Sequence, residues 1–211
     1  AVYFFFSGLF FYTYCFAYNS ASLAGVYGNM FYIIMFIIPI ITMKTFAEEK
    51  RQKTDQALLT APTSLTEIVL GKFLGAFILY LICSCIYLVY AVIISFFTTP
   101  EWSVILCTFG VVLLGASLIA INVFISVLTE SMIIAAVFGM AVGLLISMMS
   151  YFASMISISW ISNALKAISF MEYYQNFTYG ILSIVDVVFF LSVTTLFLFF
   201  TVRALEKRRW S

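Results

Sequence analysis

The residues that could do chemistry are concentrated in one polar segment, residues 44–62. Its charged side chains are of both signs: Lys44, Glu48, Glu49, Lys50, Arg51, Lys53 and Asp55. Glu49 and Lys53 have the i,i+4 spacing of neighbours on one helix face, and so do Arg51 and Asp55, so each pair can attract across a turn. Apolar anchors lie near the two ends of the segment: Phe46, Leu58 and Leu59. A short charged helix of this kind suits docking of a soluble partner, and the alternative is a solvated loop whose basic residues only set membrane topology.

The rest of the chain holds little catalytic chemistry. It has no histidine, which removes the commonest general base and metal ligand. Its four cysteines lie in apolar runs and are expected to be packing residues. No carboxylate pair has a useful spacing, which argues against a membrane-embedded enzyme acting on lipid. We therefore expect no catalytic, cofactor or metal site.

The sequence also lacks the phosphate-binding motif of an ATPase. A phosphate-binding loop needs G-x-x-x-x-G-K-[ST], whose backbone N–H groups hold the phosphates. Gly71 and Lys72 are followed by Phe73, and Thr66 stands where the first glycine belongs. Any ATP used with this protein must be hydrolysed by another polypeptide.

The elements that position the polar segment are apolar. The chain has 211 residues, of which 64% are hydrophobic and 9% are charged, whereas soluble domains carry about 25% charged residues. Lipid must therefore be the main solvent, and a membrane span needs about 20 apolar residues. Six such stretches predict an all-α polytopic membrane protein: residues 1–18, 29–46, 66–95, 103–128, 132–158 and 182–204. Residues 159–181 mix polar and aromatic side chains, which suits short interfacial or re-entrant helices.

The positive charges predict the orientation of the chain. Lys44, Lys50, Arg51, Lys53 and Lys72 bracket the second connection, and Arg203, Lys207, Arg208 and Arg209 close the chain. Four spans separate these two groups, so both lie on one side, which the positive-inside rule makes cytoplasmic. Residues 159–181 then lie on the outer face. Because the sequence starts at Ala1 without a methionine, we also expect a longer natural N-terminus.

Local signals refine the spans. Ser64 and Glu67 have the spacing of a capping box, which predicts that the third helix begins there. Pro39 falls within the second span, where it cannot donate the i→i−4 hydrogen bond, so we expect an accommodated kink.

Two glycine pairs have G-x-x-x-G spacing, which allows close helix contact: Gly71 with Gly75, and Gly139 with Gly143. Packing within one chain is favoured over packing across a dimer, and both stay open.

Three further polar residues lie at or near span depth. Asp186 could face a water-filled pathway, pair with Lys166 or lie solvated at the interface. Glu172 reads as an interfacial charge, and Asn122 is expected to bond another helix. We mark Asp186, Glu172 and Asn122 as candidates for a pathway or an outer gate.

The polar segment and its flanks resemble the signature of ABC-2 type transporter permeases. The resemblance rests on residues 39–50 (PIITMKTFAEEK), 54–62 (TDQALLTAP) and 67–73 (EIVLGKF). The tail resembles the same family at residues 176–181 (NFTYGI), 196–198 (LFL) and 205–210 (LEKRRW). The branch most similar is that of the gliding-motility-associated permeases.

That resemblance implies a type V exporter-like permease fold of six spans in the inner membrane of a bacterium. Residues 47–60 would be a cytoplasmic coupling helix that inserts into a separate ATPase, and residues 159–181 an outer lid. The implied docking residues are Glu48, Glu49, Lys50, Arg51, Lys53, Thr54, Asp55, Leu58 and Leu59. The implied partners are two ABC ATPase subunits carrying ATP and Mg²⁺, a second permease half, identical or sibling, and membrane lipid, without nucleic acid. A passive channel or a scaffold subunit is the alternative, and the substrate stays open.

Overall fold

The computed structural model describes residues 1–18, 23–53, 64–96, 102–156 and 158–209. Within these ranges the chain is helical and has no strand. The N-terminal helices are α1 (Val2–Phe11), a π-helical continuation (Tyr12–Ala17), α2 (Ala24–Thr42) and α3 (Ala47–Arg51). They are followed by α5 (Leu65–Ser84), α6 (Ile86–Ser95), α7 (Trp102–Leu128), α8 (Met132–Met155), α9 (Ser159–Ile168), α10 (Phe170–Thr178) and α11 (Ile184–Arg209).

Five segments of the described chain are long and apolar enough to cross a membrane. They are Ala24–Arg51, Leu65–Ser95, Ser103–Leu128, Met132–Met155 and Ile184–Lys207. The sixth apolar helix, Val2–Ala17, lies where the first span is predicted and is shorter than the other five. The prediction of an all-α polytopic membrane protein is confirmed.

The second span differs most from its predicted limits of 29 and 46. It begins at Ala24, because the polar Asn29 is accommodated inside the helix, where its Nδ2 donates to the Gly25 carbonyl at 2.8 Å and to the Tyr14 hydroxyl at 2.9 Å. Helix α2 ends at Thr42, four residues before the predicted limit, and after a turn the same apolar segment continues into α3 as far as Arg51. The third span begins with the predicted capping box of Ser64 and Glu67.

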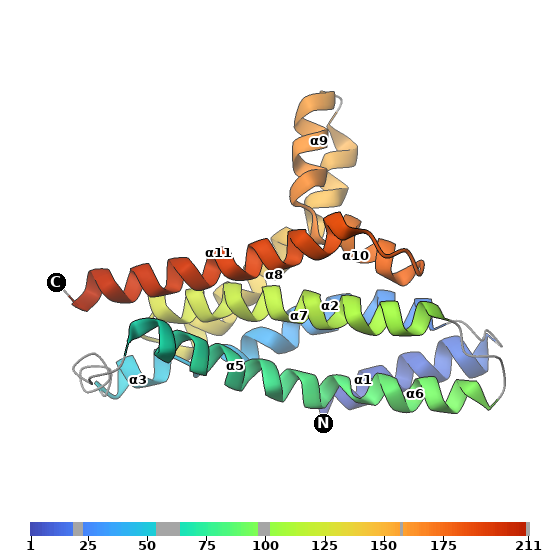
Figure 1. Ribbon diagram of the computed structural model, residues 1–211, viewed down its shortest axis with the longest axis horizontal. Coiled ribbons are helices and arrows are strands. Elements are labelled where there is room, and N and C mark those ends of the chain that lie inside the picture. The colour runs from blue at the N-terminus through green and yellow to red at the C-terminus, as the bar shows by residue number, and fades with distance from the viewer. Residues whose placement is uncertain (19–22, 54–63, 97–101, 157, 210–211) are drawn as a thin grey trace.

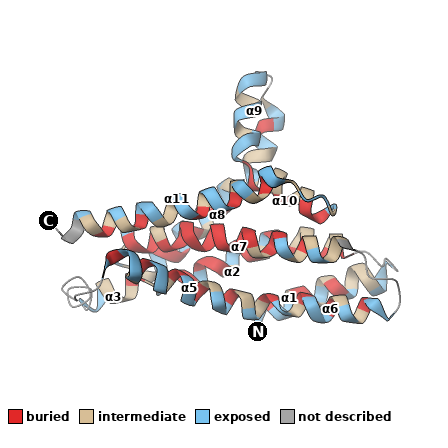
Figure 2. Ribbon diagram, viewed as in Figure 1, coloured by how far each residue is buried: buried red, intermediate tan, exposed pale blue. Residues whose placement is uncertain are grey.

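Helix α7 forms the centre of the bundle. It lies between α11 on one side and α5 on the other (Figure 1), and it also packs against α2, α8 and α10. Its residues are the most continuously buried in the chain (Figure 2). The end of α8 packs on α9, and this pair projects away from the bundle (Figure 1).

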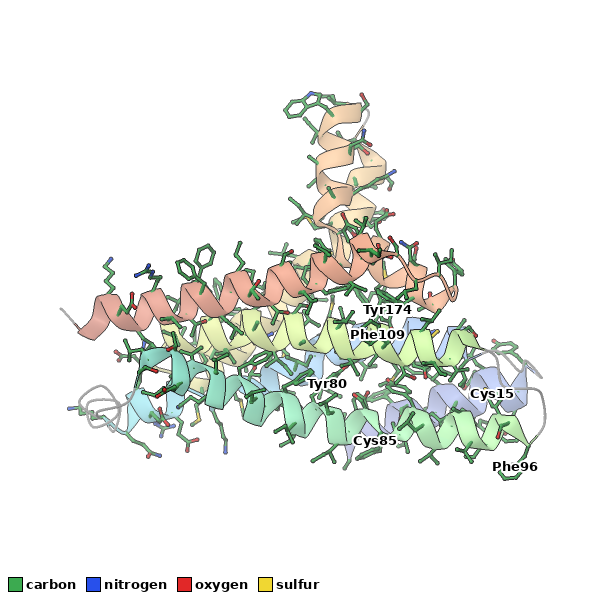
Figure 3. The ribbon with its side chains drawn as sticks, viewed as in Figure 1. Cys15, Tyr80, Cys85, Phe96, Phe109 and Tyr174 are labelled. Carbon is green, nitrogen blue, oxygen red and sulfur yellow. The ribbon has the colours of Figure 1, made fainter. Side chains whose placement is uncertain are left out.

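Hydroxyl groups of buried tyrosines bond the helices to one another. Tyr80 of α5 donates to the Val111 carbonyl of α7 at 2.9 Å, and Tyr174 of α10 donates to the Tyr27 carbonyl of α2 at 2.8 Å. Both tyrosines are fully buried inside the bundle (Figure 3). Three more hydroxyl pairs join helices in the same way: Tyr3 with Tyr87, Ser7 with Tyr90 and Tyr27 with Thr108. Each pair satisfies polar atoms where lipid supplies no partner.

Glycines mark the closest helix contacts. A Cβ on Gly115 of α7 would lie 2.0 Å from the Tyr80 ring, so the tyrosine fits only against a bare backbone. A Cβ on Gly139 of α8 would lie 2.0 Å from Asn122 Oδ1 and 3.0 Å from the Pro39 Cβ. The Gly139–Gly143 pair therefore packs within the chain, against α2 and α7. The Gly71–Gly75 pair has nothing within 4 Å of its added Cβ positions among the described residues.

These contacts predict opposite outcomes for two alanine substitutions in helices. Gly115→Ala should destabilise the protein by about 1–3 kcal/mol, because the Tyr80 ring must move. Gly75→Ala is the matched control and should leave stability unchanged or raise it by up to about 1 kcal/mol, since alanine is the better helix former. Thermal unfolding of both variants in detergent measures the difference, and equal melting temperatures would contradict the packing.

Candidate functional site

Helix α3 is the short polar helix that the sequence predicts. It runs from Ala47 to Arg51, with acids in its first turn and bases in its last turn, which suits the helix dipole. It is shorter than the predicted 47–60. Gln52 caps its end and Lys53 has a left-handed backbone with φ of 56°, so the helix does not continue through these residues. Residues 54–60 lie outside the described residues.

A serine from α7 caps the start of α3. The first N–H groups of a helix have no partner within it. Here the Ser126 hydroxyl accepts hydrogen bonds from the backbone N–H of Phe46 at 3.1 Å and of Ala47 at 3.0 Å. Ser126, Phe46 and Ala47 are all buried. The cap that normally comes from the preceding residue of the same chain segment is thus supplied by a helix about 80 residues away in sequence.

Lys50 makes a second connection to the same helix. Its Nζ donates to the Val127 carbonyl, in the last turn of α7. The last carbonyls of a helix lack partners within it and carry the negative end of the dipole, so a lysine is favourable there. Both contacts hold α3 against the end of α7.

Lys72 connects α3 to α5. Its ammonium forms an ion pair with Glu49, donates to the Thr45 carbonyl and lies 4.2 Å from the centre of the Phe46 ring. The side chains of Lys72 and Glu49 are 18% and 34% exposed. Partial burial shields this pair from solvent and salt, so it should bind more strongly than an exposed ion pair. Helix α3 is therefore attached to two membrane helices, α7 and α5.

The predicted docking residues separate into two groups. Glu49 and Lys50 are turned toward the membrane helices and hold α3 in place, whereas Arg51 and Lys53 are exposed. Glu48 is half-buried and accepts a hydrogen bond from Gln52 at 3.4 Å. The partner of Glu49 is thus Lys72 rather than the predicted Lys53. The remaining docking residues lie outside the described residues: Thr54, Asp55, Leu58 and Leu59.

Sequence reasoning named Glu49 and Lys50 as docking residues but did not identify Ser126 and Lys72 as the residues to which α3 is fastened. Lys72 is an isolated base at the foot of the third span, and its charge in an apolar helix was the signal that could have marked it. Ser126 is one serine among many in the spans, and nothing in the linear sequence connects it with Phe46.

The three candidate pathway residues form hydrogen bonds, either with a neighbouring helix or within their own helix. Asp186 of α11 is buried and accepts from Asn176 of α10 at 2.9 Å, in place of the suggested Lys166. Glu172 of α10 accepts from Ser150 of α8 at 2.8 Å. The structure therefore brings both acids to α10, where they position this short helix.

Asn122 lies apart from these acids, at the crossing of α2, α7 and α8. Its Nδ2 donates to the Leu118 carbonyl of its own helix at 2.8 Å, rather than to another helix as expected. Its Oδ1 faces Gly139 of α8.

Two comparisons with known proteins bear on these features. A family model described as "ABC-2 family transporter protein" matches residues 3–204, nearly the whole chain. No curated protein matches the sequence significantly.

Because the Ser126 hydroxyl caps α3, we predict that its removal destabilises this helix locally. Ser126→Ala leaves two buried N–H groups without their acceptor, so α3 should loosen at a cost of about 1–2 kcal/mol. Hydrogen exchange at residues 46–51 should become faster while the rest of α7 keeps its protection. Ser147→Ala is the control, because Ser147 is a serine of α8 that bonds only the Leu144 carbonyl of its own helix. Unchanged exchange at residues 46–51 would show that the serine does not hold the helix.

Proposed function

Because this chain belongs to the ABC-2 family of transporter proteins, we propose that it is half of an ATP-driven exporter that moves its substrate outward. Membership makes it the membrane-spanning permease subunit of an ABC transporter, which works with an ABC ATPase. The observation that carries the finer proposal is the seating of α3, a short helix with acids in its first turn and bases in its last turn, which is fixed to α7 and α5.

We propose that α3 and the residues after it form the surface that the ATPase contacts. Arg51 and Lys53 are exposed, and they lead directly into residues 54–62, which complete the polar segment. The contacts that hold α3 are made by Ser126 and Val127 of α7 and by Lys72 of α5. A soluble partner can therefore engage the outer face without displacing the contacts that hold the helix.

The attachments offer a route for transmitting motion. A movement imposed on α3 acts on α7 through Ser126 and Val127, and on α5 through Lys72. Since α7 packs against α2, α5, α8, α10 and α11, its displacement reaches most of the bundle. Close-packed interiors transmit strain rather than absorb it. ATP and Mg²⁺ on two partner ATPases would shift the permease between conformations by binding one of them better.

The side of the membrane follows from the charges. The end of the bundle that bears α3 also bears the end of α11 (Figure 1), so the basic residues of both segments lie together. We propose that this end and the C-terminus are cytoplasmic, in the inner membrane of a bacterium, as the positive-inside rule requires. Helices α9 and α10 would then lie at the outer face, and a second permease half, identical or sibling, would complete the pathway.

Site-specific photocrosslinking tests the docking surface in living cells. A photoreactive residue in place of Arg51 should capture a protein that contains a G-x-x-x-x-G-K-[ST] nucleotide-binding motif, identified by mass spectrometry of the product. The same residue in place of Lys166, an exposed base on α9, is the control and should not capture it. Capture from Lys166 and not from Arg51 would reverse the proposed orientation.

Exchanging the charges on the outer part of α3 tests the electrostatic contribution. The double variant Glu48→Lys with Arg51→Glu keeps the net charge, and therefore the topology signal, but inverts the charge pattern. Co-purification of the ATPase should fall about tenfold or more, as expected when complementary charges are replaced by repulsive ones. Lys166→Glu should have no effect, and an unchanged yield of complex in the double variant would count against docking at α3.

A further inference from the structure

A groove between the start of α5 and the end of α11 has polar residues at one end and apolar residues along the rest, which matches the polar headgroup and apolar chain of a phospholipid. It has a volume of about 370 Å³ and is lined by Thr66, Val69, Leu70, Leu198, Phe199, Val202, Arg203 and Glu206. The polar members stand at the end of the helices, and the apolar members lie deeper along both spans. We propose that an anionic phospholipid binds here, with its phosphate at Arg203 and the upper part of an acyl chain in the groove.

Arg203 has donors to spare for a phosphate. Its guanidinium donates from one nitrogen to Glu206 at 2.7 Å and lies 5.0 Å from the centre of the Phe199 ring. An arginine carries five N–H donors in a planar fork that matches phosphate oxygens. The pair with Glu206 uses one of its terminal nitrogens, so the other can face a headgroup. The ring contact and the ion pair hold the guanidinium at the rim of the groove.

Charge complementarity favours an anionic headgroup over a neutral one. Residues 203–209 hold four bases, Arg203, Lys207, Arg208 and Arg209, and one acid, Glu206, which gives a net charge of 4 − 1 = +3. Lys207 follows Arg203 by four residues and is also exposed, so the basic face continues toward the membrane surface. Basic pockets between membrane helices bind the headgroups of anionic lipids. The opposite wall of the groove is formed by Thr66, Val69 and Leu70 of α5. The acid nearest to them in the sequence is Glu67, which is exposed.

The deeper lining excludes a hydrophilic occupant. Val69, Leu70 and Leu198 present only carbon to the groove, and a free phosphate or a polar metabolite would leave this part empty or filled with water at a cost. A chain of methylene groups fills it favourably. The inference goes beyond the proposed transport function and does not depend on the ATPase.

Lipid retention by the full chain tests the site. The protein is reconstituted in bilayers that contain phosphatidylglycerol and phosphatidylcholine, extracted gently and examined by native mass spectrometry. Wild-type protein should retain phosphatidylglycerol selectively, and Arg203→Gln should lower that retention about tenfold, the effect of losing a charged hydrogen bond. Equal retention of the two lipids by the wild type would overturn the proposal.

Two control pairs separate lipid binding from stability. Glu206→Gln breaks the same ion pair as Arg203→Gln but leaves the arginine free, so it should keep or raise phosphatidylglycerol retention. Leu70→Trp should obstruct the groove and lower retention. Leu74→Trp, a similarly exposed position one turn along α5 and outside the lining, should not. A parallel fall with Glu206→Gln and Arg203→Gln would mean that the ion pair is only structural, and no change with Arg203→Gln would assign retention to the basic tail in general.

Discussion

A bilayer offers no hydrogen-bond partner to a polar group, and most features of this structure answer that constraint. Helices satisfy their own backbone, and the side-chain hydroxyls within them either bond back to the same helix or meet another hydroxyl or carbonyl. The hydroxyls of the buried Tyr80 and Tyr174 donate to carbonyls of other helices, so these residues bond helices together as well as filling space. Asp186 is tolerated in the first turn of α11 because Asn176 donates to it inside the fold. Polar groups that bond from one helix to another therefore mark helix contacts in this chain.

Lipid tails compete equally well for apolar side chains, so close packing must come from shape. The glycines of α7 and α8 provide that shape where they meet Tyr80, Asn122 and Pro39. Pro39 removes one donor from α2, and α8 approaches the affected turn through Gly139, near Pro39, and Gly143, near Met35. Helix α7 sits at the meeting point of these contacts, which explains why it is the most buried span.

Helix α3 carries its charges at one end of the bundle, against α7 (Figure 1). Its acids and bases would be costly at span depth. They lie at the end of α7, where the ion pair of Glu49 and Lys72 is partly buried. Ser126, Lys50 and Lys72 together fix the position of a helix that is too short to be stable alone. The same attachments leave Arg51 and Lys53 exposed, which fits a surface that a second protein contacts.

The linear sequence determined the solvent, the helical class and the approximate spans, because these depend on composition and on runs of neighbouring residues. It also determined the capping box of Ser64 and Glu67, which needs only local spacing. Only the tertiary structure decided that Glu49 pairs with Lys72, that Ser126 caps α3, and that Gly139 packs inside the chain while Gly75 does not. These outcomes depend on which helix faces meet, and residues 23 positions apart (Glu49 and Lys72) or 80 positions apart (Ser126 and Phe46) come together only when the bundle is packed.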